Sequence, residues 1–333
     1  MAGDALKDRD RAMEWKVYYE PGSHHEEQPG REVPINKTFS WGKQTWYLPA
    51  AYLCEKGLVM DLCVRGDIVE VKAFIGKWLP YERHPHRMNE ELREMSQREN
   101  PLRADIRAAL HCNGTLLRES RAQGNGWFPA SCAWDGWKNS AAAQRLLEHY
   151  GLDKESPWSF TRVYFPWEGQ EGPQELRELC LRLEARPVSY TAGCFDGAKE
   201  GREVSFHDPL SHKEYILTVM ETEKQELPET AFQQEGYEYP RTYLAMRYTV
   251  TPELPREALQ VLDRSRGDKV RKHTDDGPVA MLSSAVGPIV RMGKKHEPRT
   301  AISSLYFELP EVLEWRIVLR EKLLEDMEIR LLP

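Results

Sequence analysis

The chain has 333 residues, about twice the length of a common domain, and this length predicts two domains. Hydrophobic residues make up 40% of it and charged residues 30%, a composition typical of globular proteins that excludes disorder throughout the chain. The formal net charge is -7, and the basic residues are interleaved with acidic ones. Such a chain has no long-range attraction for nucleic acid or an anionic membrane, so neither is an expected partner.

The first residues lack the apolar core of a signal peptide, and no later segment approaches the roughly 20 apolar residues of a membrane span. We therefore expect a cytoplasmic protein. The six cysteines never come closer together than the nine-residue step from Cys54 to Cys63, so the chain has no Cys-x-x-Cys pair. Reduced, structural cysteines are expected.

Residues 1–12 are charged and aperiodic and predict a disordered tail, which the first domain follows over 13–187. Helices are predicted at 67–78, where Asp67 is the N-cap, at 89–98 and at 140–150, ended by Gly151. Asn113-Gly114 predicts a tight hairpin turn, because both residues tolerate positive φ. Runs of apolar or alternating residues predict strands at 14–20, 37–49, 57–64, 104–112, 115–118, 158–167 and 179–184.

The glycine-containing stretch 187–201 is the expected crossing into a second domain, 188–333. Strands are predicted there at 203–207, 214–221, 242–251 and 301–309. The segment 311–332 alternates like two strands, yet Trp315, Leu319 and Leu323 also have helical spacing. We favour strands because the segment is similar to the strand-like 176–183, although the pattern leaves both structures open.

Two stretches of the chain are similar to one another. Gly30-Arg31-Glu32-Val33 recurs as Gly201-Arg202-Glu203-Val204, and further strand-like segments match in the same order. These pairs are 58–64 with 244–250 and 161–165 with 303–307. A fixed order of similar segments predicts a duplicated domain, and unrelated strand orders in the two halves would make the similarity chance. The Trp-rich region 65–150 has no evident counterpart and is the first place to look for a specific activity.

These patterns together predict a mainly β (α+β) fold. We expect two tandem, duplicated β-sandwich-like domains, the first with inserted helices.

The clearest candidate for metal chemistry is the run from Glu82 to Glu90, in which His84, His86 and Glu90 have the spacing His-x-His-x-x-x-Glu. Two histidines one residue apart point the same way on an extended strand, and a following carboxylate could complete a divalent metal site. The spacing resembles the first metal motif of cupins, but Trp78 stands where that family has a glycine. The other interpretation is a solvated polar loop.

A second candidate is the aromatic run from residue 127 to 137, with Trp127, Trp134 and Trp137. Aromatic faces on a β scaffold can stack on sugar rings or apolar ligands. Ordinary packing in the core or at a domain interface is the competing interpretation. The sequence contains no Gly-x-Ser-x-Gly, phosphate-binding P-loop or dinucleotide-binding glycine motif.

Several strand and turn segments are similar to a group of bacterial proteins of unknown function from gut Firmicutes. They include Phe206-His207-Asp208-Pro209, Tyr239-Pro240-Arg241-Thr242-Tyr243 and Ser303-Ser304-Leu305-Tyr306-Phe307. The resemblance implies a bacterial cytoplasmic protein and brings no catalytic residue with it.

We therefore expect a non-enzymatic binding or scaffold protein that recognises a protein or a ligand, such as a carbohydrate, through its β domains. It needs no cofactor. The alternative is a metal-binding protein or a metal-dependent enzyme that uses His84, His86 and Glu90. The sequence does not indicate the oligomeric state, the identity of the ligand or whether catalysis occurs.

Overall fold

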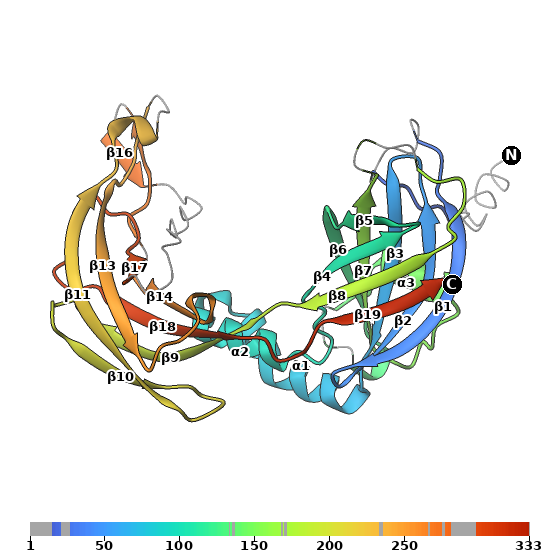
Figure 1. Ribbon diagram of the computed structural model, residues 1–333, viewed down its shortest axis with the longest axis horizontal. Helices are drawn as coiled ribbons and strands as arrows, with labels where there is room; N and C mark the ends of the chain where they lie inside the picture. Colours follow the sequence, from blue (N-terminus) through green and yellow to red (C-terminus); the bar gives the residue numbers. More distant parts are fainter. Residues whose placement is uncertain are drawn as a thin grey trace, which may run out of the picture. The chain divides into compact units, whose positions relative to one another are not determined.

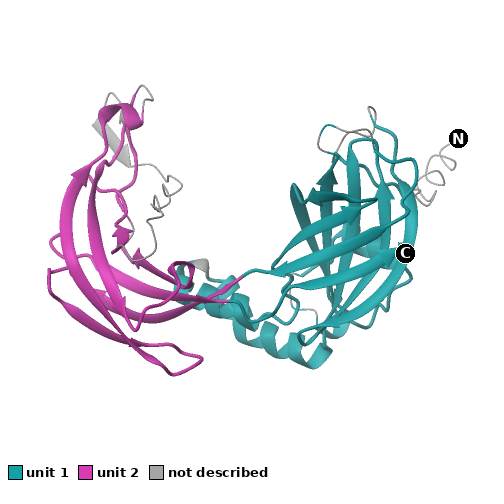
Figure 2. Cartoon of the chain, viewed as in Figure 1, with its two compact units in different colours: residues 1–186, 322–333 teal, residues 187–321 magenta. Residues whose placement is uncertain are grey.

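The computed structural model describes residues 15–20, 27–132, 134, 137–167, 169, 172–232, 236–265, 267–274, 277–280 and 298–332. The predicted tail 1–12 lies outside these residues. The fold is mainly β, as the sequence predicts, with antiparallel sheets and few helices (Figure 1). The chain divides into two compact units (Figure 2). Unit 1 comprises Met1–Arg186 and Lys322–Pro333, and unit 2 comprises Pro187–Glu321.

The described part of unit 1 contains two antiparallel sheets. The first has the strand order β1-β2-β3-β7-β6 and the second the order β19-β8-β4-β5. The strands of the first are β1 (Arg31–Trp41), β2 (Gln44–Leu53), β3 (Gly57–Arg65), β6 (Arg121–Trp127) and β7 (Trp158–Pro166). Those of the second are β4 (Ile106–Cys112), β5 (Thr115–Arg118), β8 (Leu179–Ala185) and β19 (Met327–Leu332).

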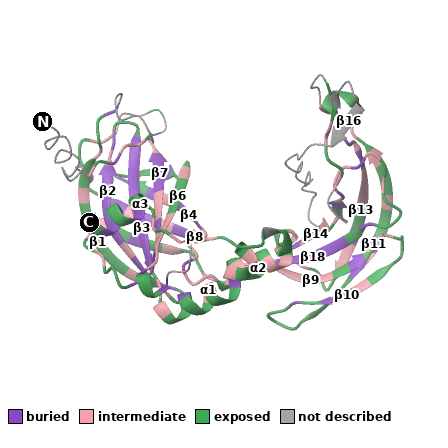
Figure 3. Cartoon of the chain, turned by 180° about the vertical axis from the view of Figure 1, so that it is seen from behind, coloured by how far each residue is buried: buried purple, intermediate pink, exposed green. Residues whose placement is uncertain are grey.

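The main core of unit 1 lies between these sheets, because alternate residues of each strand point to the same side. Leu58, Met60 and Leu62 of β3 meet Leu110 of β4 and Leu181 of β8 in this cluster. Figure 3 shows buried residues concentrated along β2 and β3. The two sheets therefore form a sandwich.

Among its described residues, unit 1 has three inserted helices: α1 (Ile68–Glu82), α2 (Glu90–Glu99) and α3 (Ala141–His149), with short 3-10 turns at Pro85–Arg87 and Ala130–Cys132. The predicted Asp67 N-cap is confirmed, since its side chain accepts hydrogen bonds from the backbone N–H groups of Val69 and Glu70. Ser140 caps α3 in the same way through Ala143 N–H. The predicted end of α3 is also confirmed, because Gly151 has a φ of 61°.

The outer face of the first sheet of unit 1 is covered by α3 and by residues 15–19. The sequence predicts a strand at 14–20, and this is wrong for the described residues 15–20. That segment is held by side chains and by a backbone hydrogen bond from Gly30 N to Val17 O, 2.8 Å long. With both faces of the sheet covered, eight of the nine residues of β3 are buried, Arg65 being the exception.

Unit 2 also packs two main antiparallel sheets, of orders β10-β11-β13-β17 and β14-β18-β9, and has a third sheet of order β12-β15-β16. Trp315 and Ile317 of β18 meet Leu217 and Val219 of β11 in its core. The main strands are β9 (Val188–Asp196), β10 (Glu203–His207), β11 (Glu214–Glu226), β13 (Thr242–Thr251), β14 (Leu259–Asp263), β17 (Arg299–Ile302) and β18 (Glu314–Glu321). The third sheet contains β12 (Tyr237–Glu238), β15 (Arg271–Thr274) and β16 (Gly277–Ala280), and 3-10 turns lie at Glu229–Ala231 and Arg256–Ala258.

Two of the three pairs of similar segments occupy equivalent places in the two units, whereas 161–165 lies within β7 and its match 303–307 follows β17. The first Gly-Arg-Glu-Val run leads into β1 and the second into β10, and each of these strands forms an antiparallel pair with the next strand, β2 or β11. In each unit that pair continues through a third strand, β3 or β13, to a fourth, β7 or β17. The order β1-β2-β3-β7 therefore has the same pattern of neighbours as β10-β11-β13-β17.

The C-terminal segment is formed by two strands, β18 and β19, rather than by a helix. The sequence predicts a second domain that extends to residue 333, and this is wrong for its last strand, because β19 pairs with β8 of unit 1. Ile329 enters the unit 1 core, and Trp41 Nε1 donates a hydrogen bond to Glu325 O at 2.9 Å. The chain thus passes from β8 to β9, which pairs with β18, and from β18 to β19, which pairs with β8.

No helix in the described part of the chain is long and apolar enough to cross a membrane.

We predict that Ile329→Ala lowers the free energy of unfolding of unit 1 by about 2–4 kcal/mol, because it leaves a cavity in a packed core. Ile329 is only 6% exposed. Hydrogen exchange followed by mass spectrometry should show faster exchange in β8 and unchanged exchange in β11. The matched control is Leu323→Ala, at a residue that is 54% exposed. Equal effects of the two substitutions would contradict the placement of β19.

Candidate functional site

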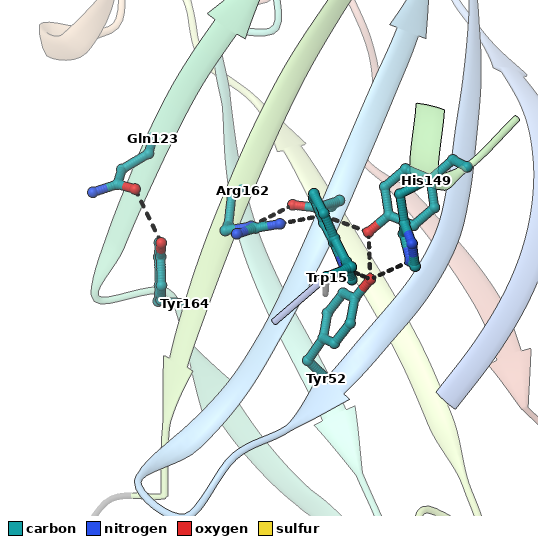
Figure 4. A network of polar contacts seen from close by, with 8 residues as sticks. Trp15, Tyr52, Gln123, His149, Arg162 and Tyr164 are labelled. Carbon is teal, nitrogen blue, oxygen red and sulfur yellow. Dashed lines mark hydrogen bonds and ion pairs between the residues drawn. The ribbon is translucent and has the colours of Figure 1, made fainter. Parts of the chain in front are cut away.

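A carboxylate lies in the middle of β3, on the outer face of the first sheet. Asp61 is 1% exposed, and Arg162 stands directly opposite it on β7. Arg162 Nε donates to Asp61 Oδ1 at 2.7 Å, and its Nη2 donates to Oδ2 at 2.8 Å (Figure 4). This two-point geometry pairs the buried charge and fixes the direction of both side chains.

Two tyrosines extend this ion pair toward the segments that cover the sheet. Tyr150 OH, just after α3, donates to Asp61 Oδ2 at 2.6 Å. The Tyr52 and Tyr150 hydroxyl oxygens are 2.7 Å apart. Because the Tyr150 proton is directed at Asp61, Tyr52 is the donor to Tyr150. Trp15 Nε1 then donates to Tyr52 OH at 2.8 Å, which attaches the N-terminal segment to the same chain of bonds (Figure 4).

His149 and Glu32 form the outer end of the network. His149 Nε2 lies 3.0 Å from Glu32 Oε2 and 3.4 Å from Tyr52 OH. A carboxylate only accepts, and the Tyr52 proton is already donated to Tyr150, so Nε2 carries a hydrogen in this arrangement. The imidazole stacks on the Trp15 indole with ring centroids 4.4 Å apart and planes 11° from parallel.

The titration properties of these groups favour a structural role. Burial raises the pKa of both Tyr52 and Tyr150 well above 10, and for Tyr150 the negative charge of Asp61 adds to the effect. Burial alone would lower the pKa of Arg162, but its hydrogen bonds to Asp61 and the charge of that carboxylate outweigh burial and raise it. Both hydroxyls therefore stay protonated, and the guanidinium stays charged, at neutral pH. The network holds α3 and the N-terminal segment against the sheet.

Unit 2 uses the corresponding position differently. When 58–64 is aligned with 244–250, Asp61 corresponds to Arg247 of β13. Arg247 is an exposed residue whose Nη1 donates to Glu221 Oε2 at 2.9 Å. On the same outer face of β11, Ile216 is 39% exposed and Met220 is 45% exposed. Of these two corresponding positions, only the one in unit 1 carries a buried polar network.

Unit 1 also contains a pocket of about 240 Å3 next to α1. Its described lining comes from α1, from the segment that follows α2, from the ends of β6 and β7 and from the loop between β6 and α3. The aromatic residues that line it are Phe74, Trp78, Phe128, Trp134, Trp137 and Trp158. Its polar lining residues are Glu82, Asn100 and Ser159.

Asn139 braces the aromatic loop. Its Oδ1 accepts from Phe128 N at 2.9 Å, and its Nδ2 donates to Phe128 O at 2.8 Å. The Phe128 ring meets Trp134 and Trp137 edge to face, at interplanar angles of 70° and 90°. The two indoles lie 4.6 Å apart, between ring centroids, and are tilted by 34°. Rings held at steep angles to one another form walls that face in different directions.

The part of the lining that comes from α1 is fixed by a hydrogen bond between two helices. Trp78 of α1 is 1% exposed, and its Nε1 donates to Glu99 Oε2 of α2 at 2.9 Å. Lys77 binds the same carboxylate, with Nζ 2.7 Å from Oε1 and 2.6 Å from Oε2. These hydrogen bonds from Lys77 lower the pKa of Glu99, so the carboxylate that holds the Trp78 indole stays ionised.

The three predicted ligand-binding tryptophans occupy different places. Trp134 and Trp137 line the pocket together. Trp127 is absent from the described lining, packs beside the cluster under α3, and donates from its Nε1 to Lys154 O at 3.0 Å. The sequence did not single out Trp78 and Trp158 as ligand-binding residues, because they come from a helix and a strand outside the aromatic run.

The predicted metal ligands lie in a turn between two helices instead of on an extended strand. His84 follows α1, His86 lies in the 3-10 turn Pro85–Arg87, and Glu90 is the first residue of α2. The two imidazole centroids are 5.8 Å apart at an angle of 63°. Within the described residues, no group of three or more His, Cys, Asp or Glu side chains is placed to hold a metal ion.

Sequence reasoning also missed Asp61, although the signal was present. Residues 58–64 are an otherwise apolar strand with a single carboxylate at the centre. A charge in a strand buried on both faces needs a partner, and that requirement points to an arginine on an adjacent strand.

We predict that Asp61→Asn lowers the free energy of unfolding by about 3–5 kcal/mol, because it leaves the Arg162 charge buried without its carboxylate partner. Urea denaturation followed by tryptophan fluorescence reports mainly on unit 1, which holds all the tryptophans except Trp315. Glu175→Gln, which removes an exposed ion pair with Arg177 in the same unit, should cost less than about 1 kcal/mol. Similar small losses for both variants would show that the network contributes little to stability.

Comparison with known proteins returned no matching family model, no similar curated protein and no similar solved structure.

Proposed function

We propose that the protein is a non-enzymatic binding protein and that the aromatic pocket of unit 1 is its ligand site. The observation that carries this proposal is the convergence of six aromatic side chains from α1, β7 and the loop before α3 on one pocket of about 240 Å3. That volume lies below the about 300 Å3 at which pockets for drug-sized ligands begin, so the ligand, or the part of it that enters, is small.

The rigidity of the walls supports a binding role. Asn139 fixes the loop at Phe128, and Glu99 fixes the indole of Trp78. A site whose side chains are already held in place loses little conformational entropy when a ligand enters. A fragment of a larger partner, such as a sugar ring of a carbohydrate or a side chain of a protein, could occupy the pocket in the same way.

The state of the buried polar groups supports a role without catalysis. The Asp61 carboxylate accepts three hydrogen bonds, two from Arg162 and one from Tyr150. A general acid or base must be free to exchange a proton with a substrate, whereas this buried carboxylate is engaged by Arg162 and Tyr150.

The alternative is a divalent metal site at His84, His86 and Glu90, as a binding site or as part of an enzyme. The observation in its favour is the 5.8 Å distance between the two imidazole centroids. As the described side chains lie, these three do not form a group that could hold a metal ion.

We also propose that the two units arose by duplication, supported by the equivalent strand orders and by the recurring Gly-Arg-Glu-Val run. On this view β19 supplies the strand of unit 1 that β9 supplies in unit 2, since they pair with β8 and β18 respectively. We further propose that the protein is cytoplasmic and related to the proteins of gut Firmicutes that it resembles.

We predict that Trp137→Leu weakens the binding of benzyl alcohol, a neutral one-ring probe, at least fivefold, because it removes one aromatic wall. Saturation-transfer NMR on the full chain measures this affinity. Trp127→Leu is the matched control, and it should leave the affinity unchanged.

Failure of the wild-type protein to bind benzyl alcohol, or equal effects of the two substitutions, would contradict the pocket as the ligand site. Stoichiometric zinc, iron or manganese in protein purified without a histidine tag, and its loss in a His84→Ala/His86→Ala variant, would instead favour the metal alternative.

A further inference from the structure

The pocket that we assign to ligand binding has an unusual charge pattern. Among its described lining residues, Glu82 is acidic and none is basic. Glu82 ends α1 and is exposed, so its carboxylate lies where water and ligand can both reach it. Asn100 and Ser159 are the neutral polar members of the lining. A cation therefore meets attraction at this pocket, whereas an anion meets the charge of Glu82.

The aromatic rings add a second attraction for positive charge. The faces of indole and phenyl rings carry partial negative charge, and tryptophan gives the strongest cation–π interaction of the natural side chains. Four tryptophans contribute to the lining: Trp78, Trp134, Trp137 and Trp158. Phe128 stands at 90° to Trp137 and at 70° to Trp134, so neighbouring walls present rings in different planes. Rings at steep angles can surround a compact cation, whereas a flat ring is best bound between parallel faces.

One of the lining tryptophans already makes a cation–π contact, with a lysine outside the described lining. Lys77 Nζ lies 5.0 Å from the centroid of the Trp78 ring, within the range of a cation–π contact. That ammonium is neutralised by Glu99 through its two short hydrogen bonds. Lys77 therefore adds no net positive charge that would repel a cationic ligand.

We propose that the aromatic pocket of unit 1 binds a small organic cation of the alkylammonium or quaternary ammonium class. This inference rests on the proposed function and specifies its ligand. The methyl groups of a quaternary ammonium are apolar enough to leave water, and its charge is spread over them, so burial against indole faces costs less than for a bare ion. Glu82 at the rim supplies the opposite charge without being buried.

The test compares choline with 3,3-dimethyl-1-butanol, which has the same shape and hydroxyl group but carbon in place of the charged nitrogen. Ligand-observed NMR titrations of the full chain, with benzyl alcohol as the neutral reference probe, give the three affinities. We expect choline to bind about tenfold more tightly than its uncharged isostere, which corresponds to about 1.4 kcal/mol. Glu82→Gln should weaken choline binding severalfold and leave the isostere unaffected. Glu70→Gln, on the same helix and outside the pocket lining, should change neither.

Two results would overturn the inference: equal affinity for choline and its isostere, or unchanged choline binding in Glu82→Gln. If benzyl alcohol still binds in a Trp137-dependent way, the pocket remains a ligand site and only its preference for cations is refuted. If none of the three probes binds, the proposed function fails as well.

Discussion

The structure of unit 1 depends on covering both faces of β3. Its central residues, 58–64, are all apolar except Asp61, and the whole run is buried. The second sheet covers one face through the main core, and α3 with residues 15–19 covers the other. The outer face must also provide partners for the Asp61 carboxylate, because leaving this buried charge unpaired would cost several kcal/mol of stability. Arg162, Tyr150 and Tyr52 meet that need and link the covering segments to the sheet.

The segments that cover the outer face of the sheet also position part of the pocket lining. The loop with Phe128, Trp134 and Trp137 ends at Ser140, which caps α3 and whose Oγ lies 3.3 Å from Asn125 Oδ1. Trp158 belongs both to the cluster under α3 and to the pocket lining. Holding α3 on the sheet therefore also holds one wall of the pocket. Unit 2 has an equivalent strand order in its larger sheet, but it has an exposed Arg247 at the position of Asp61 and carries no counterpart of these helices among its described residues.

Much of the fold could be predicted because single residues carry unambiguous local signals. Asn113-Gly114 has positive φ at both residues, 48° and 83°, as a tight hairpin turn requires, and Asp67 caps α1 as expected. Alternation in 311–332 correctly favoured strands, but no local signal indicates that β19 returns to unit 1, since strand pairing is a long-range property. The strand predicted at 14–20 was wrong because side-chain contacts and the bond from Gly30 N to Val17 O, rather than a strand ladder, hold the described residues 15–20.

The site was predictable only in part for the same reason. The dense run of tryptophans indicated Trp134 and Trp137, but Trp127 faces a different cluster, and Trp78 and Trp158 join the pocket through the fold. The metal-site prediction from the spacing of His84 and His86 required an extended strand. The proline between them instead lies in a 3-10 turn that joins two helices.

The central claim is that ligand recognition occurs at the aromatic pocket of unit 1, and indole N–H correlation NMR tests it most directly, since each of the ten tryptophans gives its own signal. On titration with choline or benzyl alcohol, the signals of Trp78, Trp134, Trp137 and Trp158 should move together. Those of Trp41 and Trp46 in the core of unit 1, of Trp127 and of Trp315 in unit 2 should stay in place. Shifts confined to this second group, or no shift in any signal, would contradict the account.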